Sequence, residues 1–159
     1  MKKISTTFLV LVLALVNTSF AQYTTQWLDL VGVTENTGVL TKTAATGWNG
    51  AARSSNVLPA NTDGWIEFTV TSQRTFILGF SNNDFLSTTS FVSAIYIQTN
   101  GTISTYESSV LNSFGTIASG NIIKISREGA QVKYYKNNVV IRTVATSVAQ
   151  PLYIRALLN

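Results

Sequence analysis

Apolar and polar residues alternate in short stretches along most of the chain, which is the pattern of half-buried β-strands. Residues 65–71 (WIEFTVT) show it most clearly, because Ile66, Phe68 and Val70 share one face while more polar residues fill the other. After residue 21, no stretch keeps the 3.6-residue period of an amphipathic helix. The pattern therefore predicts an all-β protein.

The last third of the chain predicts the clearest sequence of strands. Residues 120–143 form three short apolar stretches, separated by turns at Gly129 and at Asn137-Asn138. Glycine and asparagine tolerate the positive φ angles of tight hairpin turns. Asn100-Gly101 predicts a further hairpin. The remaining predicted strands are 27–33, 38–43, 65–71, 75–80, 91–98, 102–107 and 151–158, whereas 44–56 and 108–119 are predicted to be loops.

These strands recur about every 8–12 residues with turn signals between them, which favours an antiparallel β-sandwich. The length of the chain fits a single domain over residues 22–159. Trp27 and Tyr134 are expected in its core. The sequence stops directly after its last predicted strand, which leaves open a longer protein with further strands or domains.

The first residues have the layout of a secretory signal peptide. Lys2 and Lys3 precede a continuous apolar run over 8–16, and small residues then lead to a cleavage site after Ala21. We expect a helical signal peptide over 1–21 and a secreted or cell-surface protein. The apolar run is about half of the ~20 residues that a membrane-spanning helix needs, so we expect no membrane span after cleavage.

Composition removes several classes of function. The chain has no His and no Cys, which excludes Ser-His triads, thiol nucleophiles and the usual zinc sites. Without Lys2 and Lys3, 9 basic residues face 7 acidic ones, and the net charge falls from +4 to +2. Because the basic residues form no cluster, we expect no nucleic-acid partner.

Residues 132–143 (VKYYKNNVVIRT) resemble a hairpin of the concanavalin A-like lectin/glucanase folds, which include laminin G-like and SPRY-like modules. Asn138 stands where glycine is usual in that hairpin. Further stretches that carry the resemblance are 27–29, 64–68, 77–81, 94–96 and 151–154. The resemblance implies a jelly-roll module of large secreted or surface-attached bacterial proteins. This architecture serves lectins, hydrolases, adhesion modules and spacers.

The carboxylates do not show the spacing of a glycosidase. The glucanases of the resembled fold carry a Glu-x-Asp-x-x-Glu cluster, which this sequence lacks. The closest pair, Asp63 and Glu67, would lie roughly 13 Å apart along a strand. The two known mechanisms need carboxyl groups about 5–9.5 Å apart. We therefore expect no enzyme, with a divergent glycoside hydrolase that combines carboxylates from separate strands as an alternative.

Aromatic side chains are the better candidates for a binding site, because exposed rings and nearby polar groups hold sugars and apolar ligands. They are expected to share one sheet face, although packing in the core or between strands would equally explain aromatic residues in strands. The candidates are Trp48, Trp65, Glu67, Tyr96, Tyr106 and Tyr135.

Calcium is the one cofactor that the loops suggest. Asn82 and Asp84 offer the oxygen ligands that Ca²⁺ prefers, but the same residue types also favour turns. No other cofactor is expected. The sequence thus predicts an exported, non-catalytic module that binds carbohydrate or another cell-surface ligand in adhesion, with a structural spacer or assembly module of a larger surface protein as the alternative.

Overall fold

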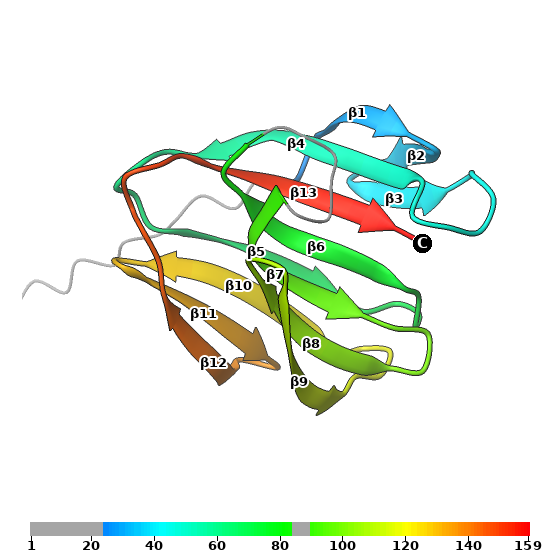
Figure 1. Cartoon of the computed structure of the whole chain (residues 1–159). Coiled ribbons are helices and arrows are strands. Elements are labelled where there is room, and N and C mark those ends of the chain that lie inside the picture. Colours follow the sequence, from blue (N-terminus) through cyan, green and yellow to red (C-terminus); the bar gives the residue numbers. More distant parts are fainter. Residues whose placement is uncertain (1–23, 84–89) are drawn as a thin grey trace, which may run out of the picture.

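The computed structural model describes residues 24–83 and 90–159, which form three antiparallel sheets (Figure 1). The large sheet contains, in spatial order, β1 (Trp27–Val31), β4 (Gly50–Leu58), β13 (Leu152–Leu158), β6 (Phe76–Ser81), β7 (Phe91–Ile97), β8 (Thr102–Glu107) and β9 (Val110–Thr116). The small sheet contains β12 (Val139–Ala145), β11 (Gln131–Lys136), β10 (Ile122–Glu128) and β5 (Gly64–Thr69). A hairpin of β2 (Val33–Asn36) and β3 (Val39–Lys42) follows β1. The predicted all-β sandwich is confirmed.

The core lies between the large and the small sheet. Ile125 on β10 stands opposite Ile66 and Tyr134 on the neighbouring strands, so the three side chains form one row across the small sheet. They pack in one apolar cluster with Phe80 and Ile95 of the large sheet. We call the face of each sheet that points to this core its inner face and the opposite face its outer face. Successive side chains along each strand alternate between these two faces, so one face of the small sheet is buried and the other is exposed.

Tyr134 is fully buried, as predicted, but Trp27 is only half-buried. The indole Nε1 of Trp27 donates a hydrogen bond to the Gly38 carbonyl at 2.8 Å. Trp27 therefore ties the start of β1 to the β2–β3 turn and is not part of the main core.

The turn predictions in the last third are confirmed by the backbone. Asn137 and Asn138 have φ angles of 50° and 66°, and Gly129 has 56°. Two successive positive φ angles give the turn a twist that matches the β11–β12 hairpin, so asparagine serves here where glycine is usual.

Two predicted loops contain strands. Within 44–56, β4 begins at Gly50 and lies between β1 and β13. Ala51 and Ala52, near the start of β4, pack on the outer and on the inner face of a crowded sheet, which leaves room only for small side chains. Small residues give little hydrophobic alternation. Within 108–119, β9 forms the edge of the large sheet, where exposed Val110 and Leu111 hide the alternation.

The predicted signal peptide over 1–21 lies outside the described residues. Within 24–83 and 90–159, no helix has the length and apolar character needed to cross a bilayer.

Ile125 provides a test of the two-sheet core. We expect Ile125→Ala to lower the free energy of unfolding by about 2–5 kcal/mol, because it removes a fully buried side chain and leaves a cavity. Urea unfolding followed by tryptophan fluorescence measures it. Val139→Ala, at a side chain that is 65% exposed, is the matched control and should change stability by less than about 0.5 kcal/mol. Equal effects of the two changes would contradict this core.

Candidate functional site

The outer face of the large sheet has a buried apolar floor of its own. Ile77, Ala94 and Leu157 lie on β6, β7 and β13 and are 4%, 0% and 6% exposed, although they point away from the small sheet. Ala51 and Phe91 belong to the same cluster. The central strands of the large sheet are thus buried on both faces, whereas antiparallel sheets commonly have one face in contact with solvent.

Tyr96 and Tyr106 stand on this floor, on adjacent strands. Tyr96 is the cross-strand partner of Ile77 on one side and of Ser104 on the other. Tyr106 is the partner of Ala94. Directly opposite residues point to the same face of a sheet, so both tyrosines project from the outer face, in neighbouring rows.

Trp48 reaches the same face from the loop that precedes β4. Its ring centroid lies 5.9 Å from that of Tyr96, at an interplanar angle of 46°, and 42% of the residue stays exposed. Tyr106 packs edge-on against Phe91, with centroids 6.4 Å apart. We call Trp48, Tyr96, Tyr106 and Phe91 the aromatic platform. Three of the six predicted binding residues therefore come together.

Gly32 fixes the loop that carries Trp48. The Gly32 carbonyl accepts hydrogen bonds from the amides of Thr43 and Ala44 at 2.9 and 3.1 Å. Gly32 has a φ angle of 57°, and a Cβ atom there would lie 2.4 Å from the Asn49 carbonyl oxygen. Only glycine fits this conformation and this contact without strain. The position of Trp48 thus depends on Gly32, although Gly32 is not part of the aromatic platform.

Cationic groups border the floor beside the rings. Arg155 is 1% exposed and lies next to Gly79 on the outer face, where its Nη1 donates to Ser90 Oγ at 3.3 Å and to the Asn83 carbonyl at 3.4 Å. Arg53, its partner on β4, forms an ion pair with Asp29 at 2.8 Å. Both guanidinium groups are therefore engaged within the protein.

The other three candidates lie on the outer face of the small sheet. Trp65 and Glu67 are on β5, and Tyr135 is on β11. The expectation that Trp65 shares a sheet face with Tyr96 and Tyr106 is wrong, because β5 pairs with β10 and not with a strand of the large sheet. Alternation placed Trp65 and Tyr135 on the face opposite to the core side chains, as the structure has them, but it could not tell which sheet their strands join.

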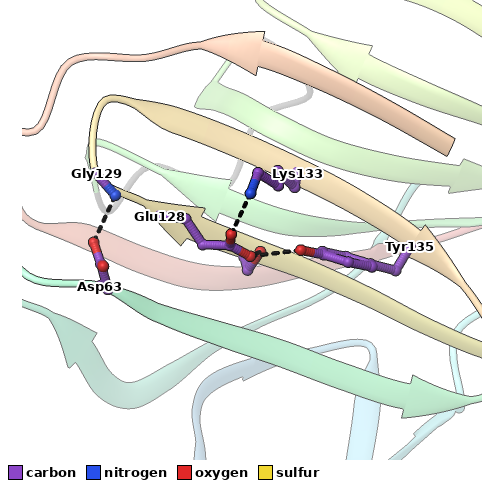
Figure 2. Close-up of polar contacts among 6 residues, drawn as sticks. Asp63, Glu128, Gly129, Lys133 and Tyr135 are labelled. Carbon is purple, nitrogen blue, oxygen red and sulfur yellow. Dashed lines mark hydrogen bonds and ion pairs between the residues drawn. The ribbon is translucent and has the colours of Figure 1, made fainter. Parts of the chain in front are cut away.

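The polar groups on the outer face of the small sheet bind one another, as Figure 2 shows. Glu128 accepts hydrogen bonds from Lys133 at 2.5 Å, from Tyr135 at 2.6 Å and from Ser126 at 2.7 Å. Lys124 lies 4.1 Å from the centre of the Tyr135 ring. Hydrogen bonds from Lys133, Ser126 and Tyr135 lower the pKa of Glu128 to about 2, and the bond to Glu128 raises the pKa of Lys133 and of Tyr135. This face carries a closed polar network.

Most of the described carboxylates are held in contacts of this kind. Asp63 accepts from the Gly129 amide at 2.7 Å, which also appears in Figure 2, and Glu35 accepts from the Gly38 amide at 2.6 Å. Asp29 pairs with Arg53, and Glu107 pairs with Arg142 at 2.6 Å. Among the described residues, Glu67 remains as an exposed carboxylate on the small sheet.

The calcium candidates give no cluster that the structure describes. Asn82 is exposed, and its side-chain oxygen accepts a hydrogen bond from Asn83 Nδ2 at 3.2 Å. Asp84 lies outside the described residues. Within the described ranges, no three His, Cys, Asp or Glu residues come together as metal ligands would.

Sequence reasoning missed the residues that build the site from below. Phe91 and Arg155 are buried on the outer face, and Gly32 anchors the loop of Trp48. The irregular register between β6 and β7 turns Phe91 to the outer face, which simple alternation does not reveal. The Gly-Trp-Asn-Gly sequence marked the loop of Trp48, which was among the predicted binding residues.

No protein-family model and no curated protein matches the chain. Among solved structures it resembles the carbohydrate-binding module CBM66 from Bacillus subtilis, with 10% identity and a TM-score of 0.49, over 82% of this chain and 89% of that one. It also resembles a β-glucanase from Bacillus licheniformis, with 11% identity and a TM-score of 0.45, over 87% and 81%.

A third similar structure is LamAcat from Zobellia galactanivorans, with 10% identity and a TM-score of 0.43 over 70% of this chain. The chain spans 59% of the length of that structure. These neighbours have glucanase and carbohydrate-binding-module folds of the concanavalin A-like jelly-roll type, which is the coarser part of the predicted resemblance. The laminin G-like or SPRY-like subtype stays a prediction.

The closed network predicts a pH-dependent contribution to stability. The pKa of Glu128 is depressed from 4.5 to about 2, so the carboxylate stabilises the fold above about pH 4.5, and this contribution disappears as the pH falls towards 2. We expect Glu128→Gln to be less stable than the wild type at neutral pH and equally stable near pH 2. Urea unfolding at a series of pH values measures this difference.

Glu67→Gln, on the same exposed face, is the matched control for the removal of one carboxylate. A constant stability difference between Glu128→Gln and the wild type from pH 7 to pH 2 would contradict an ionised, hydrogen-bonded Glu128.

Proposed function

We propose that the protein is an exported, non-catalytic module that binds carbohydrate or a related cell-surface ligand through the aromatic platform. The observation that carries this proposal is the position of Trp48, which lies 42% exposed beside Tyr96 above a dry apolar floor. A rigid, partly exposed aromatic pair offers a large contact area to the apolar face of a sugar ring.

Polar groups beside the rings support a sugar over a purely apolar ligand. Ser113 is exposed and lies in the same transverse row as Ser104 and Tyr96, on β9. Binding sites of this kind combine mostly apolar surface with a few polar groups that fix the orientation of the ligand. Asn49 is exposed next to Trp48 and adds an amide at the other end of the platform.

The non-catalytic part of the proposal rests on the carboxylates. The sequence has neither His nor Cys, and Asp29, Glu107 and Glu128 are held by Arg53, Arg142 and Lys133. A general acid needs a raised pKa and a nucleophile needs access to the substrate, whereas Glu128 has a strongly lowered pKa. A divergent glycoside hydrolase is the weaker alternative.

Export of the module rests on the sequence of residues 1–21, with their positive start, apolar run and small residues before the cleavage site. A secreted or surface-attached protein would meet glycans as ligands. The proposed partners are therefore carbohydrate or surface ligands and further domains of a longer protein.

A structural spacer or assembly module is the second candidate, and the edge strands favour it. Val110 and Leu111 on β9 are 58% and 50% exposed, and Val139 and Val140 on β12 are 65% and 47% exposed. Both strands lie at the edges of their sheets, where apolar side chains and open backbone groups favour contact with another protein.

Trp48→Ala tests the platform. We expect this change to weaken the tightest glycan ligand of the mature protein at least about ten-fold, because truncation of an aromatic anchor at a binding surface costs about 1–2 kcal/mol or more. A glycan array identifies the ligand, and isothermal titration calorimetry with and without Ca²⁺ measures the affinity.

Trp65→Ala is the matched control, since it removes the same side chain from the outer face of the other sheet. It should leave the affinity unchanged. Equal losses from Trp48→Ala and Trp65→Ala would contradict the platform. No binding to any glycan, together with changed self-association of the edge-strand variant Val139→Lys, would instead support the assembly module.

A further inference from the structure

A cavity of about 310 Å³ lies at one end of the sandwich, between the two sheets. Residues of β7, β8, β12, β13 and the β12–β13 connection line it, among them Val92, Ser93, Glu107, Val144, Ser147 and Leu152. We call it the end pocket. It borders the inner face of the large sheet, so the sheet itself separates it from the aromatic platform.

One buried hydroxyl group belongs to the lining of the end pocket. Ser93 lines the pocket and is only 2% exposed. The hydroxyl of the fully buried Tyr134 lies next to Ser93 and Glu107, and burial raises the pKa of Tyr134. Because a buried hydroxyl group without a hydrogen-bond partner costs about 1–3 kcal/mol, the Ser93 hydroxyl favours a polar ligand or water in the pocket.

The end pocket has no unbalanced charge. Among the residues that line it, only Glu107 is charged. Arg142 binds this carboxylate with two hydrogen bonds, Nε to Oε1 at 2.7 Å and Nη2 to Oε2 at 2.6 Å, and Asn112 Nδ2 lies 3.4 Å from Oε2. A fixed, neutralised ion pair offers hydrogen bonds to a neutral polar ligand better than to an ion.

Arg127 fixes the wall of the pocket. It is fully buried, and its guanidinium donates hydrogen bonds to the carbonyls of Gln150 at 3.1 Å, Thr62 at 2.7 Å and Pro59. Gln150 lines the pocket, so the β12–β13 connection is held in place independently of a ligand. Ligand sites of this size are usually preformed in the same way.

We propose that the end pocket binds one neutral, polyhydroxylated ring, such as a single sugar unit. Val92, Val144 and Leu152 provide apolar lining, and Ser93, Ser147 and Glu107 provide hydrogen-bonding groups. A sugar ring has an apolar face and hydroxyl groups at its edges, which matches this division. At about 310 Å³ the pocket lies at the lower end of the volumes of ligand sites, which is enough room for one sugar ring.

The test is a titration of the ¹⁵N-labelled mature protein with D-glucose, D-galactose, D-mannose, D-xylose and D-fructose, followed by NMR. We expect at least one sugar to shift the amide resonances of Ser93 and Ser147. Ser93→Ala should weaken that sugar roughly 5- to 10-fold, because one hydrogen bond from the pocket lining is lost.

Ser147→Trp, at an exposed position on the rim, should abolish binding by filling the pocket, and Trp48→Ala should leave it unchanged. If no sugar shifts these resonances, the pocket holds only water and the proposal is overturned. Unchanged affinity in both Ser93→Ala and Ser147→Trp, or loss of binding in Trp48→Ala, would also overturn it. A failure of the aromatic platform would appear as unchanged glycan affinity in Trp48→Ala, whereas a failure of the end pocket would appear in the sugar titration. The two proposals are therefore tested separately.

Discussion

The strands at the centre of the large sheet are buried on both faces, and the rest of the structure depends on this constraint. Ala94 and Ile95 are neighbours on β7 that point to opposite faces, yet both are 0% exposed. Space on the outer face is so limited that a Cβ atom on Gly79 would lie 2.3 Å from the Ala94 Cα atom. Close packing on two sides makes the sheet stiff, so the rings that stand on it keep a fixed spacing.

The two buried arginines lie on different sheets, Arg127 on β10 of the small sheet and Arg155 on β13 of the large sheet. Arg127 on the inner face gives up hydration for hydrogen bonds to loop carbonyls, and burial lowers its pKa while the charge of Asp63 raises it. Arg155 on the outer face is bound by Ser90 and Asn83. A buried charge is tolerated only when its donors are satisfied, so each arginine orders the loops that bind it. Arg127 orders the loops at the end pocket, and Arg155 orders the residues beside the apolar floor on the outer face of the large sheet.

The sequence predicted most of the fold because the decisive signals are local. Alternation in 65–71 and the paired positive-φ residues Asn137 and Asn138 depend only on neighbouring residues. Strand β4 was not predicted, because the packing of Ala51 and Ala52 depends on neighbouring strands that include β13, which lies far away in the sequence. The site was predictable only in part for the same reason. Alternation tells that a ring points outward, but long-range pairing decides which outer face receives it.

The two outer faces differ in what a ligand would have to displace. On the small sheet, the Glu128 carboxylate already binds Lys133, Tyr135 and Ser126, so a ligand would have to break charged contacts and remove water from their partners. On the large sheet, Trp48 presents an exposed ring above apolar groups that have already lost their water. Contact there buries further apolar area without breaking a bond. An exposed tryptophan therefore lies in a different environment on each face, and a ligand would displace fewer polar contacts on the large sheet than on the small one.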